Sequence, residues 1–478
     1  MEQALHSNPI PQAGTAAVQP AWTSAIERHR SGDTEGAIVL YQRHLKRNPQ
    51  DAPGWMNLGA ALRRTGRADA ALVCYQRALR LRPDDAAVWS NLGNLWKQFE
   101  EHEQSLYCHG RALQLDPQRM QLQLNCAVSL REAGRFTAAE DIIEQCLARE
   151  PQRPDLLYER ALLRLHTGRF REAWPDYEAR LLSAVPRLPR LDAPRWQGEC
   201  VGGKRLLLQA EPGLADTLWA ARFVAMLVRR GADITLRCAP ALHPVLAAMP
   251  VHLAPTRDTA APGVVADFHC PLLSLPGLVD PRGSTIPDPV AIAVPEDSRA
   301  IMRRRIAPYA GSFRIGIVWS GRGRERDDAR GSLPLARLMP LAALPGVQVF
   351  SLQKGPAAAD QHSAGAAGFV VDLGAQCRHF GDTAAALEPM DLVVACDSAV
   401  AQLAGCMGKP VLALLAFNPH WIYGMRGDST PWYPTMRLLR QQSPGDWSSV
   451  CTELLRLVGK WTEVRARRSL DGRATLPV

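Results

Sequence analysis

A period of 34 residues dominates the first half of the sequence. Prolines stand at positions 49, 83, 117 and 151, and other residue types keep the same interval. A fixed interval of this length is typical of solenoid proteins, in which each repeat is a supersecondary unit that cannot bury its apolar face alone. The period therefore predicts a stack of helix pairs rather than a single globular core.

Residues at fixed positions within the period indicate the type of repeat. The clearest copy covers residues 52–85 and has the spacing of a tetratricopeptide repeat. The matching residues are Trp55, Leu58, Gly59, Gly66, Ala71, Tyr75, Ala78 and Pro83. We predict about five such units over residues 18–187, after a short disordered leader at residues 1–17.

The concave face of such an array usually forms a groove for a peptide or protein. Polar residues on the first helix of each unit are candidates for lining this groove as a protein-acceptor site. They are Asn57, Asn91, Asn94 and Asn125. A solvated polar face is the alternative for each asparagine.

The sequence changes character at Val185, where a stretch rich in proline and arginine breaks the helical period. After a linker at 188–203, short apolar runs alternate with helical segments, which indicates βαβ units and parallel sheets. We predict two Rossmann-like halves, at 204–296 and 312–460, with a cleft between them and a tail at 461–478. The expected strands are 205–210, 233–238, 264–270, 314–320, 347–353, 369–373, 391–396 and 411–415.

Two turns after expected strands are candidate site elements, because open α/β sheets bind ligands where strands end and helices begin. The first runs from Glu211 to Asp216, where Asp216 opens a helix as its N-cap or acts as a general base. The second, "WSGRGRERDD" at 319–328, has glycines that permit close approach and arginines that supply positive charge. A mobile solvated loop is its alternative interpretation.

A third turn, in "VVACDSAVAQLAGCMGKPVLALL", has the pattern of an anion site. The strand ends at Asp397, Ser398 caps a helix that begins near Ala399, and Gly408 ends that helix. Free N–H groups and the helix dipole at such an N-terminus favour a phosphate. An ordinary capped helix is the alternative.

Composition limits the remaining classes of function. The net charge of +9 comes from arginines spread along the chain, which favours anionic small ligands at least as much as nucleic acid. Eleven cysteines without a CxxC pair, no secretory signal and no membrane-length apolar run predict a soluble, cytoplasmic protein. Asp327 and Asp328 do not have a metal-chelating spacing, so we expect no metal.

Several ordered motifs resemble a known family. The third turn, followed by "DSTPWYPTMRLLRQQSPGDW", is similar to the C-terminal half of bacterial tetratricopeptide-repeat proteins that carry a glycosyltransferase family 9, heptosyltransferase-like domain. "PGLADT", "FHCPLLSLP", "GIVWSG" and "SLQKGP" occur in the family's order, and the resemblance covers residues 174–460. It implies a GT-B fold, a nucleotide-diphosphate sugar donor, and metal-independent transfer with inversion.

The resemblance also implies site residues. Asp216 takes the place of the proposed catalytic base. The residues expected to bind the donor and its phosphates are Asp397, Ser398, Ala399, Val400, Lys354, Gln353, Ser320 and Gly321. The chain departs from the family at Ala215, where the family has glycine, and at Gln402, where it has histidine. The family's tryptophan-arginine-tryptophan run is replaced by "HWIYG" at 420–424.

Three functions fit this sequence. The first is a glycosyltransferase, without a cofactor beyond its donor substrate, whose repeats recruit a protein acceptor. The second is a non-catalytic interaction scaffold with a degenerate transferase domain, which Ala215 and Gln402 motivate. The third is a lipopolysaccharide heptosyltransferase. Such an enzyme has little use for five protein-binding repeats, and its glycolipid acceptor would predict membrane association.

Overall fold

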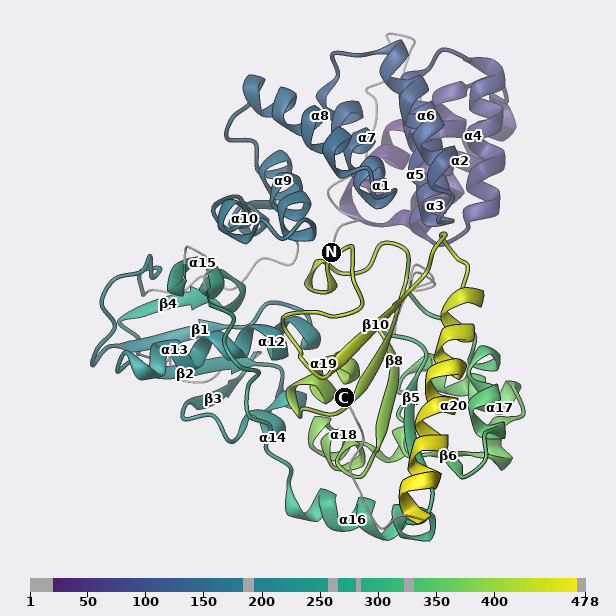
Figure 1. Ribbon diagram of the computed structural model, residues 1–478. Coiled ribbons are helices and arrows are strands. Elements are labelled where there is room, and N and C mark those ends of the chain that lie inside the picture. The colour runs from purple at the N-terminus through teal and green to yellow at the C-terminus, as the bar shows by residue number, and fades with distance from the viewer. Residues whose placement is uncertain (1–19, 184–192, 257–264, 281–284, 322–330, 471–478) are drawn as a thin grey trace. The chain divides into compact units, whose positions relative to one another are not determined.

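A computed structural model describes residues 20–183, 193–256, 265–280, 285–321 and 331–470 (Figure 1). The chain forms two compact units. The first comprises Met1–Leu163 with Ala179–Pro186, and the second comprises Arg164–Glu178 with Arg187–Val478. None of the described helices combines the length and the apolar character that crossing a bilayer requires.

The first unit is a run of antiparallel helix pairs, as the 34-residue period predicts. Its helices are α1 (Pro20–Ser31), α2 (Thr34–Arg47), α3 (Ala52–Arg64), α4 (Ala68–Leu81), α5 (Ala86–Gln98), α6 (His102–Leu115), α7 (Met120–Glu132), α8 (Phe136–Arg149), most of α9 (Pro154–His166), and α11 (Arg180–Ser183). Each helix pair leaves little space between its members. A methyl group added at Gly59 would lie 2.7 Å from the Tyr75 ring, and one at Gly93 would lie 2.6 Å from the His109 ring.

The turn inside each helix pair requires a left-handed backbone. Gly66, Gly134 and Gly168 have φ values of +73°, +73° and +77° at equivalent positions of their repeats. Glu100 occupies the same position in the third repeat with φ of +60°, and among the described residues no other non-glycine residue has a positive φ. Glycine adopts this conformation without the steric cost that a side chain incurs.

The second unit contains two parallel sheets. The first has the order β3-β2-β1-β4 and the second has the order β10-β9-β8-β5-β6-β7. The first sheet comprises β1 (Arg205–Gln209), β2 (Asp233–Cys238), β3 (His252–Pro255) and β4 (Phe268–Pro271). The second comprises β5 (Phe313–Val318), β6 (Val347–Ser351), β7 (Val370–Asp372), β8 (Leu392–Cys396), β9 (Val411–Leu415) and β10 (Met436–Arg440). The α/β class with parallel sheets is therefore confirmed, whereas β3 and β10 were not among the expected strands.

Helices cover these sheets and connect their strands. Around the first sheet they are α12 (Leu214–Ala220), α13 (Val224–Arg229), α14 (His243–Leu246) and α15 (Leu275–Val279). Around the second sheet they are α16 (Glu296–Ile306), α17 (Asp360–Ser363), α18 (Phe380–Leu387), α19 (Ala399–Cys406) and α20 (Ser448–Leu470). The core of the second sheet is apolar, with Ile315, Val394, Leu412 and Leu414 all fully buried.

Each sheet has a point where the strand order reverses. The chain runs from β1 through β2 to β3 and then returns to place β4 on the other side of β1. It likewise runs from β5 through β6 to β7 and returns to place β8 beside β5. Ligands of open α/β sheets bind outside the carboxyl ends of the strands at such points.

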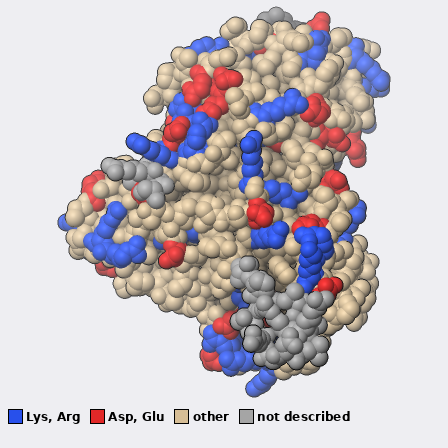
Figure 2. Space-filling view, in the orientation of Figure 1, with Lys and Arg blue, Asp and Glu red and all other residues tan. Residues whose placement is uncertain are grey.

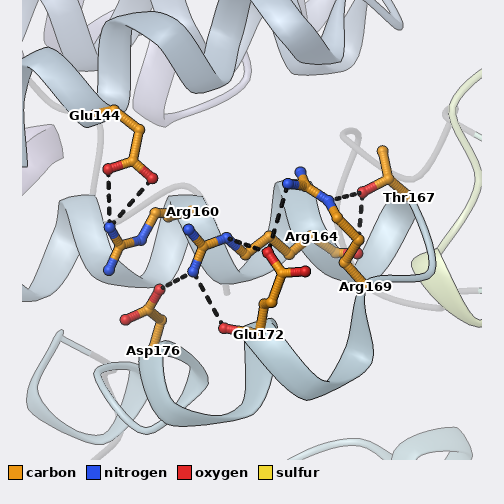
Figure 3. A network of polar contacts seen from close by, with 7 residues as sticks. All are labelled: Glu144, Arg160, Arg164, Thr167, Arg169, Glu172 and Asp176. Carbon is orange, nitrogen blue, oxygen red and sulfur yellow. Dashed lines mark hydrogen bonds and ion pairs between the residues drawn. The ribbon is translucent and has the colours of Figure 1, made fainter. Parts of the chain in front are cut away.

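The last repeat is divided between the two units. In α9, Arg160 forms an ion pair with Glu144 of α8 at 3.0 Å, whereas Arg164, one turn later, pairs with Asp176 of α10 (Phe170–Tyr177) at 3.0 Å (Figure 3). Trp174 of α10 packs against Trp219 and Trp421 of the α/β unit, with ring centroids 6.4 and 6.0 Å apart. This aromatic packing is why α10, predicted as part of an array at 18–187, clusters with the second unit.

Candidate functional site

The turn after β1 holds Asp216 at the first reversal point. Gly213, with φ of +132°, is the N-cap residue of α12, and Asp216 is in the first helical turn. The expectation that Asp216 opens the helix as its N-cap is therefore corrected. Its carboxylate folds back over Gly213, since a methyl group added there would collide with Asp216 Oδ2. The side chain is 37% exposed.

Ala215 is compatible with this turn. It lies inside α12, and the left-handed conformation belongs to Gly213. The methyl group of Ala215 therefore carries none of the conformational cost that a left-handed backbone imposes on a side chain. The glycine-to-alanine departure from the resembled family does not strain the backbone.

The turns after β5 and β6 are joined by one buried side chain. The amide oxygen of Gln353 accepts hydrogen bonds from the backbone N–H groups of Trp319 and Ser320, both at 3.0 Å. The amide nitrogen of Gln353 donates to the backbone oxygens of Ser320 and Lys354, at 3.0 and 2.9 Å. Gln353 is 4% exposed, and its hydrogen bonds fix the two turns relative to each other.

The turn after β8 lies against the turn after β5. A methyl group added at Gly321 would overlap the backbone oxygen of Asp397, so only glycine fits this approach. Ser398 caps α19 as predicted, because its hydroxyl accepts from the Ala401 amide at 3.2 Å. Gly408, with φ of +65°, follows the end of α19, also as predicted. The structure thus brings Ser320, Gly321, Asp397 and Ser398 together at the second reversal point.

The Asp397 side chain has a partner that sequence reasoning missed. The hydroxyl of Tyr423 donates to Asp397 Oδ1 at 3.1 Å. Burial, together with the neighbouring Asp397 carboxylate, raises the pKa of Tyr423 well above its ordinary value. Tyr423 therefore stays a neutral donor and orients Asp397. Its signal in the sequence is the run at 420–424, which stands out there only as a departure from the resembled family.

Gln402 has a structural contact of its own. It is 2% exposed on α19, and its amide oxygen accepts a hydrogen bond from the Tyr433 hydroxyl at 3.1 Å. Burial raises the pKa of Tyr433 well above its ordinary value, so this donor is retained at neutral pH. The residue that departs from the family's histidine is thus fixed inside the fold.

The two halves of the α/β unit meet through α12 and α19, which lie side by side in Figure 1. Arg222, 1% exposed, follows α12 and donates to the backbone oxygen of Trp432 at 2.9 Å. Its guanidinium also lies 4.8 Å from the centroid of the Tyr433 ring. Since a buried guanidinium needs such partners, these contacts hold the two halves together.

One residue from the second half reaches Asp216. His420 Nε2 lies 3.9 Å from Asp216 Oδ1, and the imidazole packs against Trp421 with centroids 5.3 Å apart. The other ring nitrogen of His420 and the amide oxygen of Asn418 are buried without a hydrogen-bond partner. Buried polar atoms of folded proteins are usually hydrogen-bonded, so a water or a ligand group could complete these two. Asp216 therefore faces a polar segment of the other half.

Some predicted site residues lie elsewhere. The ammonium group of Lys354 donates to the backbone oxygen of Cys377, which follows β7, so it points away from the reversal point between β5 and β8. The arginines Arg322, Arg324 and Arg326 lie outside the described residues. Two open hollows, of about 390 and 600 Å³, lie beside the edge strands β10 and β7, away from Asp216 and Asp397.

The four asparagines of the repeat array are buried. Their exposed fractions are 2% for Asn57, 7% for Asn91, 2% for Asn94 and 0% for Asn125. The side chain of Asn125 donates to Ser90 Oγ of the preceding repeat at 2.9 Å. The Asn125 amide thus connects two neighbouring repeats, and all four side chains are largely withdrawn from the groove surface.

Comparisons with known proteins support the array directly. Residues 60–98 match the family model described as TPR repeat, and residues 125–189 match that described as tetratricopeptide repeat. Protein FlbA of Caulobacter vibrioides is 26% identical in an alignment of 362 residues that covers 68% of this chain and 58% of FlbA. The match therefore spans less than two thirds of FlbA.

Solved structures match about a third of the chain. TTC0263, a thermophilic TPR protein of Thermus thermophilus, is 24% identical over 36% of this chain and 93% of its own, with a TM-score of 0.32. PilW, a type IV pilus biogenesis factor, is 23% identical over 35% of this chain and 77% of its own, with a TM-score of 0.32. The family matches identify the N-terminal region as tetratricopeptide repeats.

Proposed function

We propose that the protein is a glycosyltransferase that moves a sugar from a nucleotide-diphosphate donor to a protein acceptor recruited by the repeats. The observation that carries the proposal is the meeting of Gly321, Asp397 and Ser398 at the reversal point of the second sheet. The first turn of α19 begins there, with the amides of Ala399 and Val400 ahead of the capped Ala401 amide. Such a helix start suits a diphosphate, because its N–H groups and dipole favour negative charge.

The proposed chemistry also needs a base on the opposite half. Asp216 is a partly exposed carboxylate on α12, and α12 packs against α19. It is suited to take the proton from an acceptor hydroxyl as the new glycosidic bond forms. Fixed positive potential at the departing diphosphate would lower the barrier in the same step. The α19 N-terminus supports that role.

Protein recruitment is the proposed task of the repeats. Tetratricopeptide arrays present extended surfaces to protein partners. A repeat array and a sugar-nucleotide site on one chain would raise the local concentration of an acceptor near the reacting groups. The acceptor in this proposal is a protein or peptide, and the donor is a substrate.

Differential scanning fluorimetry tests the donor part. The full chain is titrated with UDP-, GDP-, ADP- and CMP-sugars and with the free nucleotides. We expect one nucleotide to raise the melting temperature, in wild type and in Asp216→Asn but not in Asp397→Ala, because binding to the native state stabilises it. Asp428→Asn, a 71% exposed carboxylate on the same half, is the matched control. No shift with any nucleotide would count against the proposal.

A second candidate is an interaction scaffold with an inactive α/β unit. The contact that favours it is Gln402, buried against Tyr433 at the position where the resembled family has histidine. Under this reading Gln402→His restores no transferase activity and leaves partner binding unchanged. If Gln402→His instead gains donor turnover, the α/β unit is better explained as a transferase domain that lacks only this histidine.

A further inference from the structure

The outer helices of three successive repeats carry an ordered pattern of exposed side chains. At one position of α2, α4 and α6 the residue is apolar: Val39, Val73 and Tyr107, which are 55%, 55% and 64% exposed. These three residues are spaced by 34 and are among the most exposed large hydrophobic side chains described. Single exposed apolar residues are common, but recurrence at the same repeat position defines a row.

Charged residues flank this row on both sides. One turn before each apolar residue stands an acid, at Glu35, Asp69 and Glu103. One turn after it stands an arginine, at Arg43, Arg77 and Arg111. Residues four apart lie on the same face of a helix, so each outer helix presents acid, apolar residue and arginine in that order.

The pattern stops at the fourth repeat. Its equivalent positions on α8 are Thr137, Asp141 and Gln145, which provide neither the acid, nor the apolar residue, nor the arginine. Contacts within the array involve part of the pattern, because the Tyr107 ring lies 6.0 Å from the Trp89 ring and the Arg77 guanidinium lies 4.8 Å from the centroid of the Trp55 ring. These contacts leave the apolar row more than half exposed, and buried positions of the repeat persist into α8, as Ala139 and Ile143 show at 0% exposure. A requirement at the surface of the first three repeats therefore explains the rows better than packing alone.

The order of the rows is self-complementary. If two copies of the face meet about a two-fold axis that runs along the apolar row, each acidic row lies opposite the arginine row of the other copy. The apolar residues then lie opposite their own copies. An axis along the helices would place acid opposite acid, which costs free energy. The charge pattern therefore selects one isologous arrangement, with antiparallel outer helices.

We propose that α2, α4 and α6 form a homodimer surface whose occupant is a second copy of this chain. The acids are available for it, because their pairs within the chain are weak. Glu35 bonds Arg67 at 2.6 Å and Glu103 bonds Arg135 at 2.6 Å, with the two glutamates 61% and 74% exposed. Exposed pairs of this kind exchange readily with an intermolecular pair.

The face is small for a permanent dimer. Three helices of 14 residues, each roughly 20 Å long and roughly 10 Å apart, present about 600 Å². Stable interfaces bury about 800 Å² per partner, so we expect reversible association in the micromolar range. Over the side of the molecule that Figure 2 shows, lysine and arginine are interspersed with aspartate and glutamate, without one dominant sign. Ordered pairing of rows, rather than net charge, carries the association.

Two charge-reversal variants of the full chain test the arrangement by sedimentation velocity from 1 to about 50 µM. The first variant is Glu35→Lys, Asp69→Lys and Glu103→Lys together, and the second is Arg43→Glu, Arg77→Glu and Arg111→Glu together. We expect wild type to dimerise and each variant alone to be monomeric. Mixed in equal amounts, the two variants should form a heterodimer, because opposite rows again face each other. Asp141→Lys with Gln145→Glu, in the fourth repeat, should leave dimerisation unchanged.

Three results would overturn the proposal: a wild type that stays monomeric, a dimer that survives both triple reversals, or reversed variants that do not associate when mixed. A second measurement does not depend on the folding of the triple variants. Val73→Cys in a Cys200→Ser background should cross-link to itself on mild oxidation, whereas Asp141→Cys should not. Absence of the Val73→Cys cross-link in a dimer would place the axis elsewhere.

Discussion

The repeat array and the α/β unit use buried polar groups in different ways. The array places them between helices at repeated positions, as with Asn125 and Ser90, and Arg131 bonds Glu159 at 2.5 Å with both side chains buried. In the α/β unit they gather at strand ends, where Gln353 joins two turns and Tyr423 orients Asp397. Polar contacts that recur between repeats stabilise the stack of helix pairs, whereas polar contacts that occur once and meet at strand ends position the candidate site.

The largest effect is expected at α10, the helix of the last repeat that belongs to the α/β unit. Trp174→Ala should lower the free energy of unfolding by about 3–5 kcal/mol, because it removes a buried aromatic side chain that is 6% exposed. Trp174 belongs to the last repeat by sequence, yet its ring packs on Trp219 and Trp421. Hydrogen exchange should therefore increase in β1 and α12 and remain unchanged in α3 and α5. Tyr75→Ala, buried in the array, should give the reverse distribution.

Acid should destabilise the array before the α/β unit. Burial, with Lys97 nearby, lowers the pKa of His109 to about 3 from 6.5. Below pH 6.5 the unfolded chain binds a proton that the folded chain does not, so stability is full above that pH and falls by about 1.4 kcal/mol per pH unit below it. Urea unfolding at pH 7 and pH 5 measures the loss. In His109→Tyr, which copies the tyrosine of the second repeat, the loss should be smaller.

The α/β unit should lose less stability near pH 5, although burial also lowers the pKa of His269, and its carboxylates should respond at lower pH. Although burial alone would raise the pKa of Asp382, hydrogen bonds from Arg378 and Ser298 lower it well below its ordinary value. Its contribution is therefore present above pH 3.8 and is lost as pH falls further. If exchange in α16 and α18 increases at pH 5 before that in α5 and α6, the comparison fails.

Removing the Gln353 side chain should affect the candidate site more than the stability of the fold. Gln353→Ala removes the acceptor of the Trp319 and Ser320 amides, which lowers the free energy of unfolding by about 1–3 kcal/mol. The turn that carries Gly321 loses its fixed position, so any nucleotide-dependent rise in melting temperature should also be lost. Gln361→Ala is the matched control, because that buried amide bonds Val370 at the sheet edge instead. Equal loss of nucleotide response in both variants would argue against a specific role.

A small stabilisation is expected in the array. Glu100→Gly should raise the free energy of unfolding by about 1 kcal/mol, because it removes the steric cost of a side chain at a left-handed backbone position. The equivalent positions of other repeats have glycine. Thermal denaturation measures it, and Gly66→Glu is the converse change. A destabilised Glu100→Gly variant would mean that the Glu100 side chain contributes more than its backbone costs.

The sequence predicted the features that recur along the chain and those that depend on neighbouring residues alone. The 34-residue period determines the helix pairs, and the apolar runs of β8 and β9 locate their strands within a residue. β10 was missed because two of its five residues are arginines, so it forms no continuous apolar run. Asp216 was placed at its turn, but the N-cap, one of the two roles predicted for it, belongs to Gly213, since the backbone φ decides between them. The partners of Gln353 and Asp397 lie 26 to 34 residues away, where local patterns carry no information.

The central claim is that a nucleotide diphosphate binds where β5 and β8 end. Hydrogen exchange of the full chain, with and without the nucleotide that raises its melting temperature, tests this most directly. We predict protection at Gly321 and over residues 397–401, with α3, α5 and α7 of the array unchanged. Protection confined to the array, or to the hollows beside β7 and β10, would contradict the claim.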